Sequence, residues 1–323
     1  MGPVNYERGL QEIGNSAYAY LQPDGGWGWS NAGLLVDGDR TLLVDTLFDL
    51  RLTSQMLDEM KRAVPAAASI ETLVNSHANG DHTFGNQLVQ GAEIIASERT
   101  AREMIDVPLL ETMRAHLAEA DELGLAGRFI REAFGAFDFG PVRLVPPTRT
   151  FSGMLTLRLG AKRVELIEVG PAHTRGDIIV HVPEERLLFA GDILFIGGHP
   201  VMWAGPFENW VAACDRILGL DVDVIVPGHG PITDKAGVQA VRDYLDYVGR
   251  EARSLYDAGV PAAEAARRID LSQYADWIDG ERIAVNVRTV YRNLDGDTRA
   301  PDRLELFGEM AKLRFANEGE EAR

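Results

Sequence analysis

Four short segments of the chain carry residues that could bind metal ions, and each is an apolar run that stops at a polar turn. The segments are LVNSHANGDH (73–82), LIEVGPAHTRGD (166–177), LLFAGD (187–192) and VIVPGHGP (224–231). The candidate ligands in them are His77, Asn79, Asp81, His82, His173, Asp192 and His229. A single one of these histidines would be an ordinary hydrogen-bonded side chain, but together with the aspartates they indicate a metal site. Imidazole and carboxylate ligands suit zinc, iron or manganese, and two ions about 3.5–4 Å apart could share this many ligands.

The apolar runs are predicted β-strands, so the candidate ligands lie in loops at strand ends. Layered α/β proteins place ligands in such loops because the sheet holds the base of each loop rigidly. Glycines and prolines beside the polar residues, such as Gly80 and Pro227, permit the tight turns that this requires. His116 and His181 lie inside regular elements and are predicted to be structural.

Strands and helices alternate along the chain, which predicts an α/β protein with helices covering its sheets. Strands are expected in SAYAYLQ, NAGLLVDGD, TLLVDTL, IETLVNS, GAEIIAS, MLTLRLG, RVELIEVG, DIIVHVP, RLLFAGD and VDVIVPG. Helical spacing appears at 53–64 and 209–218, in a long insertion at 98–139, and over most of the region from 234 onward. We therefore expect a catalytic domain of residues 1–233, with a helical C-terminal extension of residues 234–323 packed on it.

The charge and the amino-acid composition limit the kinds of molecule that the protein is expected to bind. The 323 residues include 49 acidic and 32 basic side chains, for a formal net charge of −17, which disfavours nucleic acid and anionic membrane surfaces. No apolar run approaches the roughly 20 residues that span a bilayer. The N-terminus lacks the pattern of a secretory signal, so the expected location is the cytoplasm. Cys214 is the single cysteine, which excludes a cysteine-based zinc cluster within these residues. The sequence is compatible with a homo-oligomer as well as with a monomer.

The motifs resemble those of the metallo-β-lactamase superfamily. The resemblance rests on H-x-N-x-D-H at His77–His82, on the later His173, on Asp192 after a strand and on His229 in PGHGP. The order and spacing of these loops agree with the family over residues 18–231. The resemblance implies a four-layer αββα sandwich with a site for one or two metal ions at one edge.

Carried across residue by residue, the resemblance implies two adjoining metal sites. One would use His77, residue 79 and His173, and the other would use Asp81, His82 and His229, with Asp192 as the bridge. In hydrolytic members a hydroxide between the ions would be the nucleophile. Asp81 and Asp192 are thus the expected catalytic residues. Asp45 in LLVDTL matches the family's buried aspartate, which supports the loop below the site.

The chain departs from the family motif at Asn79, where the family has histidine. An amide oxygen is a weaker ligand for zinc than imidazole. We therefore expect the His77/His173 half to bind its metal more weakly or to use a different ion. A one-metal enzyme held by Asp81, His82 and His229 is the alternative.

Aromatic residues gather in the segments that should border the site. Trp27 and Trp29 lie in a Gly-rich loop that is expected to be exposed, and Trp203 follows Asp192. His199 is expected near the pocket mouth, and a compensating metal ligand is its alternative role, since two glycines precede it. With residues 98–139 as a helical lid, these side chains predict a pocket for a small apolar or aromatic substrate.

The function expected from these features is hydrolysis of a small ester, thioester, lactone or lactam with one or two Zn²⁺ ions, iron or manganese being alternatives. A second hypothesis is a cyclase or lyase that uses the metal as a Lewis acid to stabilise an enolate. It comes from segments such as GGWGWSNAGLLV and HANGDHTFGNQLV, which are similar to the cyclase-type enzymes of aromatic polyketide pathways. A flavodiiron-like oxidoreductase would need a carboxylate at residue 79 and a flavin domain. Residue 79 is asparagine and no flavin domain is recognised in the sequence, so this class is disfavoured. A non-catalytic binding module is disfavoured because six of the seven expected ligands are retained.

Overall fold

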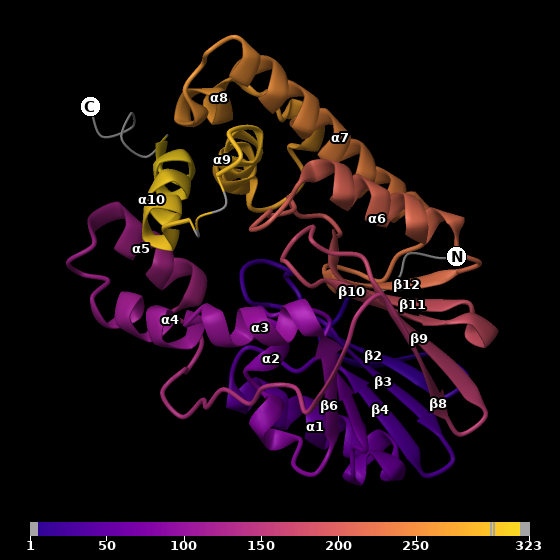
Figure 1. Cartoon of the computed structure of the whole chain (residues 1–323). Helices are drawn as coiled ribbons and strands as arrows, with labels where there is room; N and C mark the ends of the chain where they lie inside the picture. Colours follow the sequence, from indigo (N-terminus) through magenta and orange to yellow (C-terminus); the bar gives the residue numbers. More distant parts are fainter. Residues whose placement is uncertain (1–5, 298, 300, 317–323) are drawn as a thin grey trace.

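Two β-sheets lie face to face at the centre of the molecule in the computed structural model, which describes residues 6–297, 299 and 301–316 (Figure 1). The strands of the first sheet follow their order in the chain: β1 (Gly9–Gly14), β2 (Ala17–Leu21), β3 (Ala32–Asp37), β4 (Arg40–Val44), β5 (Thr72–Val74), β6 (Glu93–Ser97) and β7 (Arg149–Phe151). The second sheet runs through β12 (Val224–His229), β11 (Leu187–Phe195), β10 (Ile178–Val182), β9 (Lys162–Glu168) and β8 (Met154–Leu159).

The strand directions decide which loops are neighbours. β4, β5, β6 and β7 pair in parallel, and so do β11 and β12, while the other pairs are antiparallel. Parallel strands end at the same edge of a sheet, so the loops after β4 and β5 lie side by side. The register of β11 against β12 shifts on both sides of Gly191. This irregular stretch of β11 carries Asp192.

The strand sequences are apolar on both faces because each sheet is covered on both sides. Within β3 and β4, Leu35 and Leu42 belong to the core between the two sheets, whereas Leu34 and Leu43 belong to the core beneath the helices. Successive side chains of a strand point to opposite faces, which accounts for this division. Apolar runs such as LLVD and TLLV are the consequence.

Helices cover the outer faces of both sheets. α1 (Leu50–Ala63) covers the first sheet and begins at Asp49, whose carboxylate accepts a hydrogen bond from Leu52 N. α6 (Phe207–Gly219) and α7 (Lys235–Asp257) cover the second sheet, and Trp210 on α6 donates to the carbonyl of Ile193 in β11 at 3.0 Å. The predicted four-layer αββα sandwich is thus confirmed.

The remaining helices come from the two regions predicted to be helical. The insertion forms α3 (Glu98–Asp106), α4 (Leu109–Ala118) and α5 (Gly124–Phe134), and the C-terminal region adds α8 (Ala262–Arg268), α9 (Ile283–Leu294) and α10 (Arg303–Arg314). α10 packs on α5, where the rings of Phe307 and Phe129 stack at 5.9 Å. β1 and β7 are not predicted from the sequence; both are edge strands of the first sheet.

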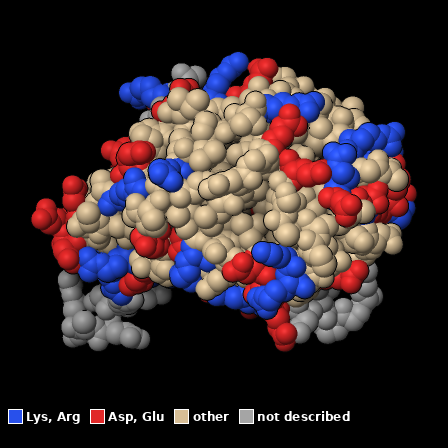
Figure 2. Space-filling model, turned by 90° about the horizontal axis from the view of Figure 1, so that it is seen from below, with Lys and Arg blue, Asp and Glu red and all other residues tan. Residues whose placement is uncertain are grey.

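Charged side chains of both signs are interspersed over the face shown in Figure 2, and in its described part neither sign forms a continuous area. Across the described ranges, no helix combines the length and the apolar character that a membrane span requires. The absence of a nucleic-acid partner stays a prediction from composition.

Candidate metal centre

The predicted ligands come from four places in the fold and meet at one edge of the sandwich. The loop after β5 carries His77 and Asn79, and the short helix α2 (Gly80–Thr83) that follows carries Asp81 and His82. The loop between β9 and β10 carries His173. The second sheet supplies Asp192 from the irregular part of β11 and His229 from the end of β12.

Asp192 lies at the centre of the cluster. Its Oδ2 is 3.2 Å from Nε2 of His173, 3.5 Å from Nε2 of His229 and 3.6 Å from Nε2 of His77. Its Oδ1 is 3.1 Å from Nε2 of His82. The carboxylate is thus surrounded by four imidazole nitrogens of the same kind. This central place agrees with the bridging role that the resemblance implies.

The four histidines point Nε2 inward because an oxygen atom holds Nδ1 of each ring. The pairs, with their Nδ1 to oxygen distances, are His77 with Ser76 Oγ (2.9 Å), His82 with Asp45 Oδ2 (2.9 Å), His173 with the carbonyl of Val201 (2.6 Å) and His229 with the carbonyl of Trp29 (3.1 Å). An oxygen that accepts the Nδ1 proton leaves the lone pair on Nε2, which is the arrangement of metal-binding histidines.

Asp45 organises the loop beneath the site. Its carboxylate accepts hydrogen bonds from the backbone N of Ser76 at 2.7 Å and from the Ser76 hydroxyl at 2.6 Å, besides that from His82. Because the Ser76 hydroxyl donates its proton to Asp45, its oxygen is left to accept from His77. One buried carboxylate therefore orients two of the four imidazoles, as expected for this aspartate.

The chemistry of the donor set fits a metal ion. Nε2 of His77, Nε2 of His82 and Oδ1 of Asp192 are buried and form no hydrogen bond of good geometry in the described part of the chain, although the last two lie 3.1 Å apart. Two groups of ligand atoms lie within 4.8 Å of one another: His77, His82 and Asp192, and Asp81, His82 and His229. Buried polar atoms left unpaired are costly, and a cation at this point would satisfy them.

His173 is placed differently from what the resemblance implies. It belongs to neither compact group, and its Nε2 lies 2.9 Å from Nδ2 of Asn79. Since Nδ1 of His173 faces the Val201 carbonyl, Nε2 carries a lone pair and accepts from the Asn79 amide. The lone pair that a metal would need is therefore already engaged.

Two of the histidines favour the charged form. Burial alone would lower the pKa of His229, but the carboxylates of Asp192 and Asp81 outweigh it and raise that pKa to about 9. Burial is likewise outweighed at His82, whose pKa is raised well above its usual value by three carboxylates, that of Asp192 foremost. Protons on these two rings would balance the buried carboxylates in the metal-free protein.

The other two histidines stay neutral. Burial lowers the pKa of His77 well below its usual value, and the neighbouring His82 lowers it further. Burial also lowers the pKa of His173, to about 4. A metal ion entering the cluster would therefore displace protons from one pair of rings and find the other pair already deprotonated.

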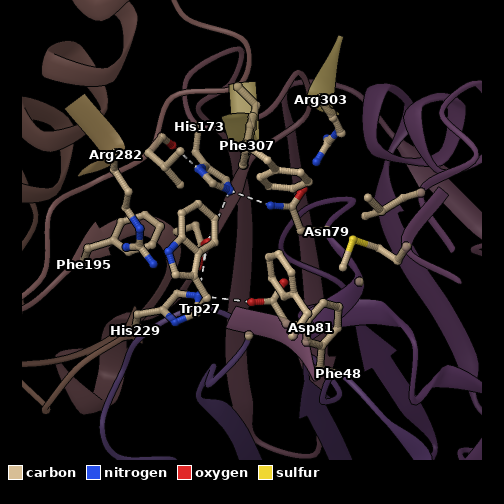
Figure 3. A pocket seen from close by; sticks show the side chains of 18 residues that line it. Trp27, Phe48, Asn79, Asp81, His173, Phe195, His229, Arg282, Arg303 and Phe307 are labelled. Atoms are coloured by element: carbon tan, nitrogen blue, oxygen red, sulfur yellow. Dashed lines mark hydrogen bonds and ion pairs between the residues drawn. The ribbon is translucent and has the colours of Figure 1, made fainter. Parts of the chain in front are cut away.

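A cavity of about 50 Å³ opens onto the cluster (Figure 3). Of the predicted ligands, Asn79, Asp81, His173, Asp192 and His229 form part of its wall. Aromatic and basic side chains form much of the rest: Trp27, Phe48, Phe134, Phe195, Trp203, Phe307, Arg282 and Arg303. The helical insertion contributes Leu109, Met113 and Phe134 to this wall. The residues around the cavity are thus mostly apolar, with the charges at a few points.

Two of the four residues predicted for the substrate pocket do not line the cavity. Trp27 and Trp203 do, with ring centroids 6.3 Å apart. The ring of Trp29 is half-buried against Phe137 at 4.8 Å and contributes only its carbonyl to the site, by holding His229. The expectation of an exposed loop is also wrong, because the rings of Trp27 and Trp29 both pack on the core.

His199 does not line the metal-site cavity and does not belong to the cluster of possible ligands. Its backbone N donates to the carbonyl of Ile278 at 2.9 Å, which fixes it beside the C-terminal region. There its ring is buried against Tyr244, with Nδ1 3.2 Å from the hydroxyl. The carbonyl of His199 accepts a hydrogen bond from Arg282 at 2.8 Å. His199 thus helps to hold Arg282, which lines the metal-site cavity.

The sequence analysis missed the contribution of the C-terminal helices to the cavity. Arg282 precedes α9, and Arg303 and Phe307 lie on α10. No local sequence motif marks them. Arg303 and Phe307 reach the site because α10 packs on α5 of the insertion.

Similarity to known proteins covers the part of the chain that carries the cluster, since the model of the Metallo-beta-lactamase superfamily matches residues 25–229. The 2,4-dinitroanisole O-demethylase subunit alpha of Nocardioides sp. (strain JS1661) is 27% identical over 202 residues, which are 61% of this chain and 51% of the relative. The acyl-coenzyme A thioesterase MBLAC2 of Homo sapiens is 23% identical over 216 residues, 62% of this chain and 72% of the relative. The solved structure of an inverting sec-alkylsulfatase from Pseudomonas sp. matches 93% of this chain and 52% of its own, with a TM-score of 0.69 and 17% identity. The chain thus spans about half the length of the demethylase subunit and of the alkylsulfatase.

Proposed function

Since the chain belongs to the metallo-β-lactamase superfamily, we propose that it is a metal-dependent hydrolase of a small ester, thioester, lactone or lactam. The observation that carries this proposal is the convergence of four inward-facing Nε2 atoms on the Asp192 carboxylate. The cluster opens into a cavity walled mainly by apolar side chains, where a small acyl group would fit.

The group of Asp81, His82 and His229 is the proposed main metal site, with Asp192 beside it. Zn²⁺ is the proposed ion because its usual ligands are imidazole nitrogens and carboxylate oxygens, and iron or manganese would accept the same donors. When bound, the ion would lower the pKa of a water molecule and polarise the substrate carbonyl.

The residues of the chain would then position the substrate and handle protons. The Asp81 side chain is 12% exposed, against 2% for that of Asp192, so Asp81 is the carboxylate with better access to the cavity. It is placed to accept a proton from an attacking water. Trp27, Phe48 and Phe134 would exclude bulk water around the acyl group and strengthen the electrostatic effect of the site.

Two relatives with named reactions support the assignment of this chain as a hydrolase, without indicating its substrate. The human relative is a thioesterase and the structural relative is a sulfatase, so the same fold serves the cleavage of different esters. The whole activity of this chain is a proposal because it spans only about half of two of these relatives.

The test is turnover of phenyl acetate, a short acyl thioester, a lactone and a chromogenic cephalosporin by protein loaded with Zn²⁺. We expect chelator-sensitive hydrolysis of at least one of them. His229→Ala should lower kcat/KM by at least about 100-fold, because a lost ligand also leaves buried carboxylates unbalanced. His181→Ala is the matched control, since His181 pairs with Glu165 in the second sheet and lies outside the cluster and both cavities.

Turnover that persists in chelator, or an equal loss in both variants, would contradict the proposal. Tight metal binding with no hydrolysis of any substrate would instead favour the cyclase or lyase hypothesis, which uses the same ligands. That hypothesis stays a prediction from sequence similarity.

A further inference from the structure

We propose that Arg303 selects substrates that carry one compact oxyanion group, a carboxylate or a sulfate, in addition to the bond to be cleaved. The inference rests on the proposed function, because it names the substrate class of the same site. It depends on where Arg303 lies between two cavities and on the charges around its guanidinium group.

Arg303 stands at the junction of the metal-site cavity and an outer cavity of about 280 Å³. It is the first residue of α10, and it shares this position only with Trp203 among the lining residues of the two cavities. The guanidinium carbon lies 4.6 Å from the centroid of the Trp203 ring. Arg303 and Trp203 thus border both cavities, and a ligand in either one would lie beside them.

The positive charge of Arg303 has no close counter-ion. Within residues 6–297, 299 and 301–316, no ion pair within 4.0 Å and no hydrogen bond joins its guanidinium group to another residue. Arg282, the other arginine of the cavity, is by contrast 2.8 Å from Asp279. The nearest carboxylate that influences Arg303 is Glu103, whose Oε2 already accepts from the backbone N of Arg175 at 3.0 Å.

An unpaired guanidinium group in a mostly apolar wall is costly to the folded protein. Burial lowers the pKa of Arg303, and the charge of Glu103 acts in the opposite direction. Such a cost is typical of a residue kept for ligand binding rather than for stability. The guanidinium fork matches the two oxygens of a carboxylate or sulfate.

The shape and charge of the cavities limit the ligand further. The inner cavity of about 50 Å³ has room for a reacting acyl group only, while the outer cavity can take the rest of the molecule. Figure 3 shows the side chains of Arg303 and Arg282 entering the inner cavity from opposite sides, with Asn79 and His173 between them. The outer cavity is lined by Glu103, Asp106 and Asp302 and by Arg175 besides Arg303, so acidic side chains outnumber basic ones there by only one and leave little room for several negative charges on a ligand. A single oxyanion close to Arg303 fits both cavities.

The first experiment compares turnover of phenyl acetate with that of 4-carboxyphenyl acetate and 4-sulfophenyl acetate by the Zn²⁺-loaded protein. We expect wild type to prefer at least one charged ester by about 10- to 100-fold in kcat/KM, as a charge-assisted contact would give. Arg303→Gln should remove that preference and change phenyl acetate turnover by less than about threefold, and Arg303→Lys should retain part of it. Arg250→Gln, on exposed α7, is the matched control and should change nothing.

The second experiment measures binding without turnover. Chelator-treated protein is titrated with benzoate, benzenesulfonate and the neutral benzamide, and tryptophan fluorescence is followed because Trp27 and Trp203 line the cavity. Benzoate or benzenesulfonate should bind at least about tenfold more tightly than benzamide, and only in the presence of Arg303. The anion that binds more tightly identifies the ligand group as a carboxylate or as a sulfate, for which the sulfonate is the stand-in.

The outcomes separate this inference from the proposed function. Anion binding that depends on Arg303, with no ester cleaved, would support the inference and refute the hydrolase. Ester cleavage without any preference for charge, or equal losses for benzoate and benzamide in Arg303→Gln, would overturn the inference. The melting temperature adds a structural check, because a residue that binds only ligand can be replaced without lowering it, whereas a drop in Arg303→Gln with uniformly weaker binding assigns Arg303 a structural role.

Discussion

Asn79 is the residue that most distinguishes this metal centre from the family pattern. Its amide nitrogen, rather than its oxygen, faces His173, and it donates to the lone pair that a metal would use. Two effects therefore weaken metal binding at this half of the site. Residue 79 offers no imidazole, and the imidazole of His173 already accepts a hydrogen bond. A metal ion that bound to His173 would first have to break the hydrogen bond between Asn79 and His173.

Replacing Asn79 by histidine should restore the missing ligand. We expect Asn79→His to bind a second equivalent of Zn²⁺, or to bind it at least about tenfold more tightly than wild type, since imidazole is the better zinc donor. Elemental analysis and calorimetric titration would measure this. Asn79→Ala is the control, because it frees His173 without adding a ligand and should gain little. Equal tight binding of two ions by wild type and Asn79→His would refute the weak half-site.

At the scale of elements, the site depends on how closely the ends of β11 and β12 approach each other. Gly228, in β12, has no room for a side chain: a Cβ atom there would lie 2.0 Å from Oδ1 of Asp192. The same turn is clamped to the first sheet by Asn31, whose side-chain amide donates to the carbonyls of Pro227 and Gly230. The pair of strands thus sets the position of the central carboxylate.

Gly228→Ala should therefore displace the Asp192 carboxylate. We expect metal affinity to fall by at least about 10- to 100-fold, the range seen when ligand orientation is lost, with the circular dichroism spectrum unchanged. Gly219→Ala is the matched control, because a Cβ atom at Gly219 meets nothing within 4 Å. Wild-type metal affinity in Gly228→Ala would show that the carboxylate can move without loss.

At the scale of the whole molecule, a metal ion would join the two halves of the sandwich. The β5 loop and α2 belong to the first sheet, whereas β11, β12 and the loop before β10 belong to the second. An ion held by Asp81 and His82 on one side and by His229 on the other would be bound by the folded state only. Binding of this kind stabilises the fold by mass action, by about 4 kcal/mol when the free metal is 1,000 times its Kd.

Chelation should therefore lower the melting temperature by about 6 °C at pH 8, and by less at lower pH. In the metal-free protein the raised pKa of His229, about 9, stabilises the fold fully below pH 6.5, and this contribution is lost as the pH rises through 9. Metal must displace that proton, so its affinity falls about tenfold for each pH unit below 9, and the proton on His82, whose pKa is also raised, makes the fall steeper. Scanning calorimetry at pH 6, 7, 8 and 9 would measure the difference. A difference that does not change with pH would contradict the proton displacement.

The strands and the set of metal-capable side chains could be predicted from the sequence because they are local properties, whereas the layer order came from the resemblance to the family. A strand that is buried on both faces is an apolar run, and a ligand at its end is a polar residue beside glycine or proline. LVNSHANGDH and VIVPGHGP contain all of this information within a few residues. β1 and β7 lack it, because short edge strands with partly exposed side chains have no such pattern.

The tertiary structure alone decided which side chains face the cavity. Trp29 and His199 have suitable types and positions in the sequence, but packing against Phe137 and Tyr244 turns their rings away. Arg303 lies more than a hundred residues from any metal ligand except His229, and it reaches the cavity because α10 packs on α5. Spacing along the chain determines neighbours within a loop, whereas the direction of a side chain across a cavity depends on contacts between distant segments. Those contacts engage His173 with Asn79 and leave Arg303 facing the metal centre without a counter-ion among the described residues.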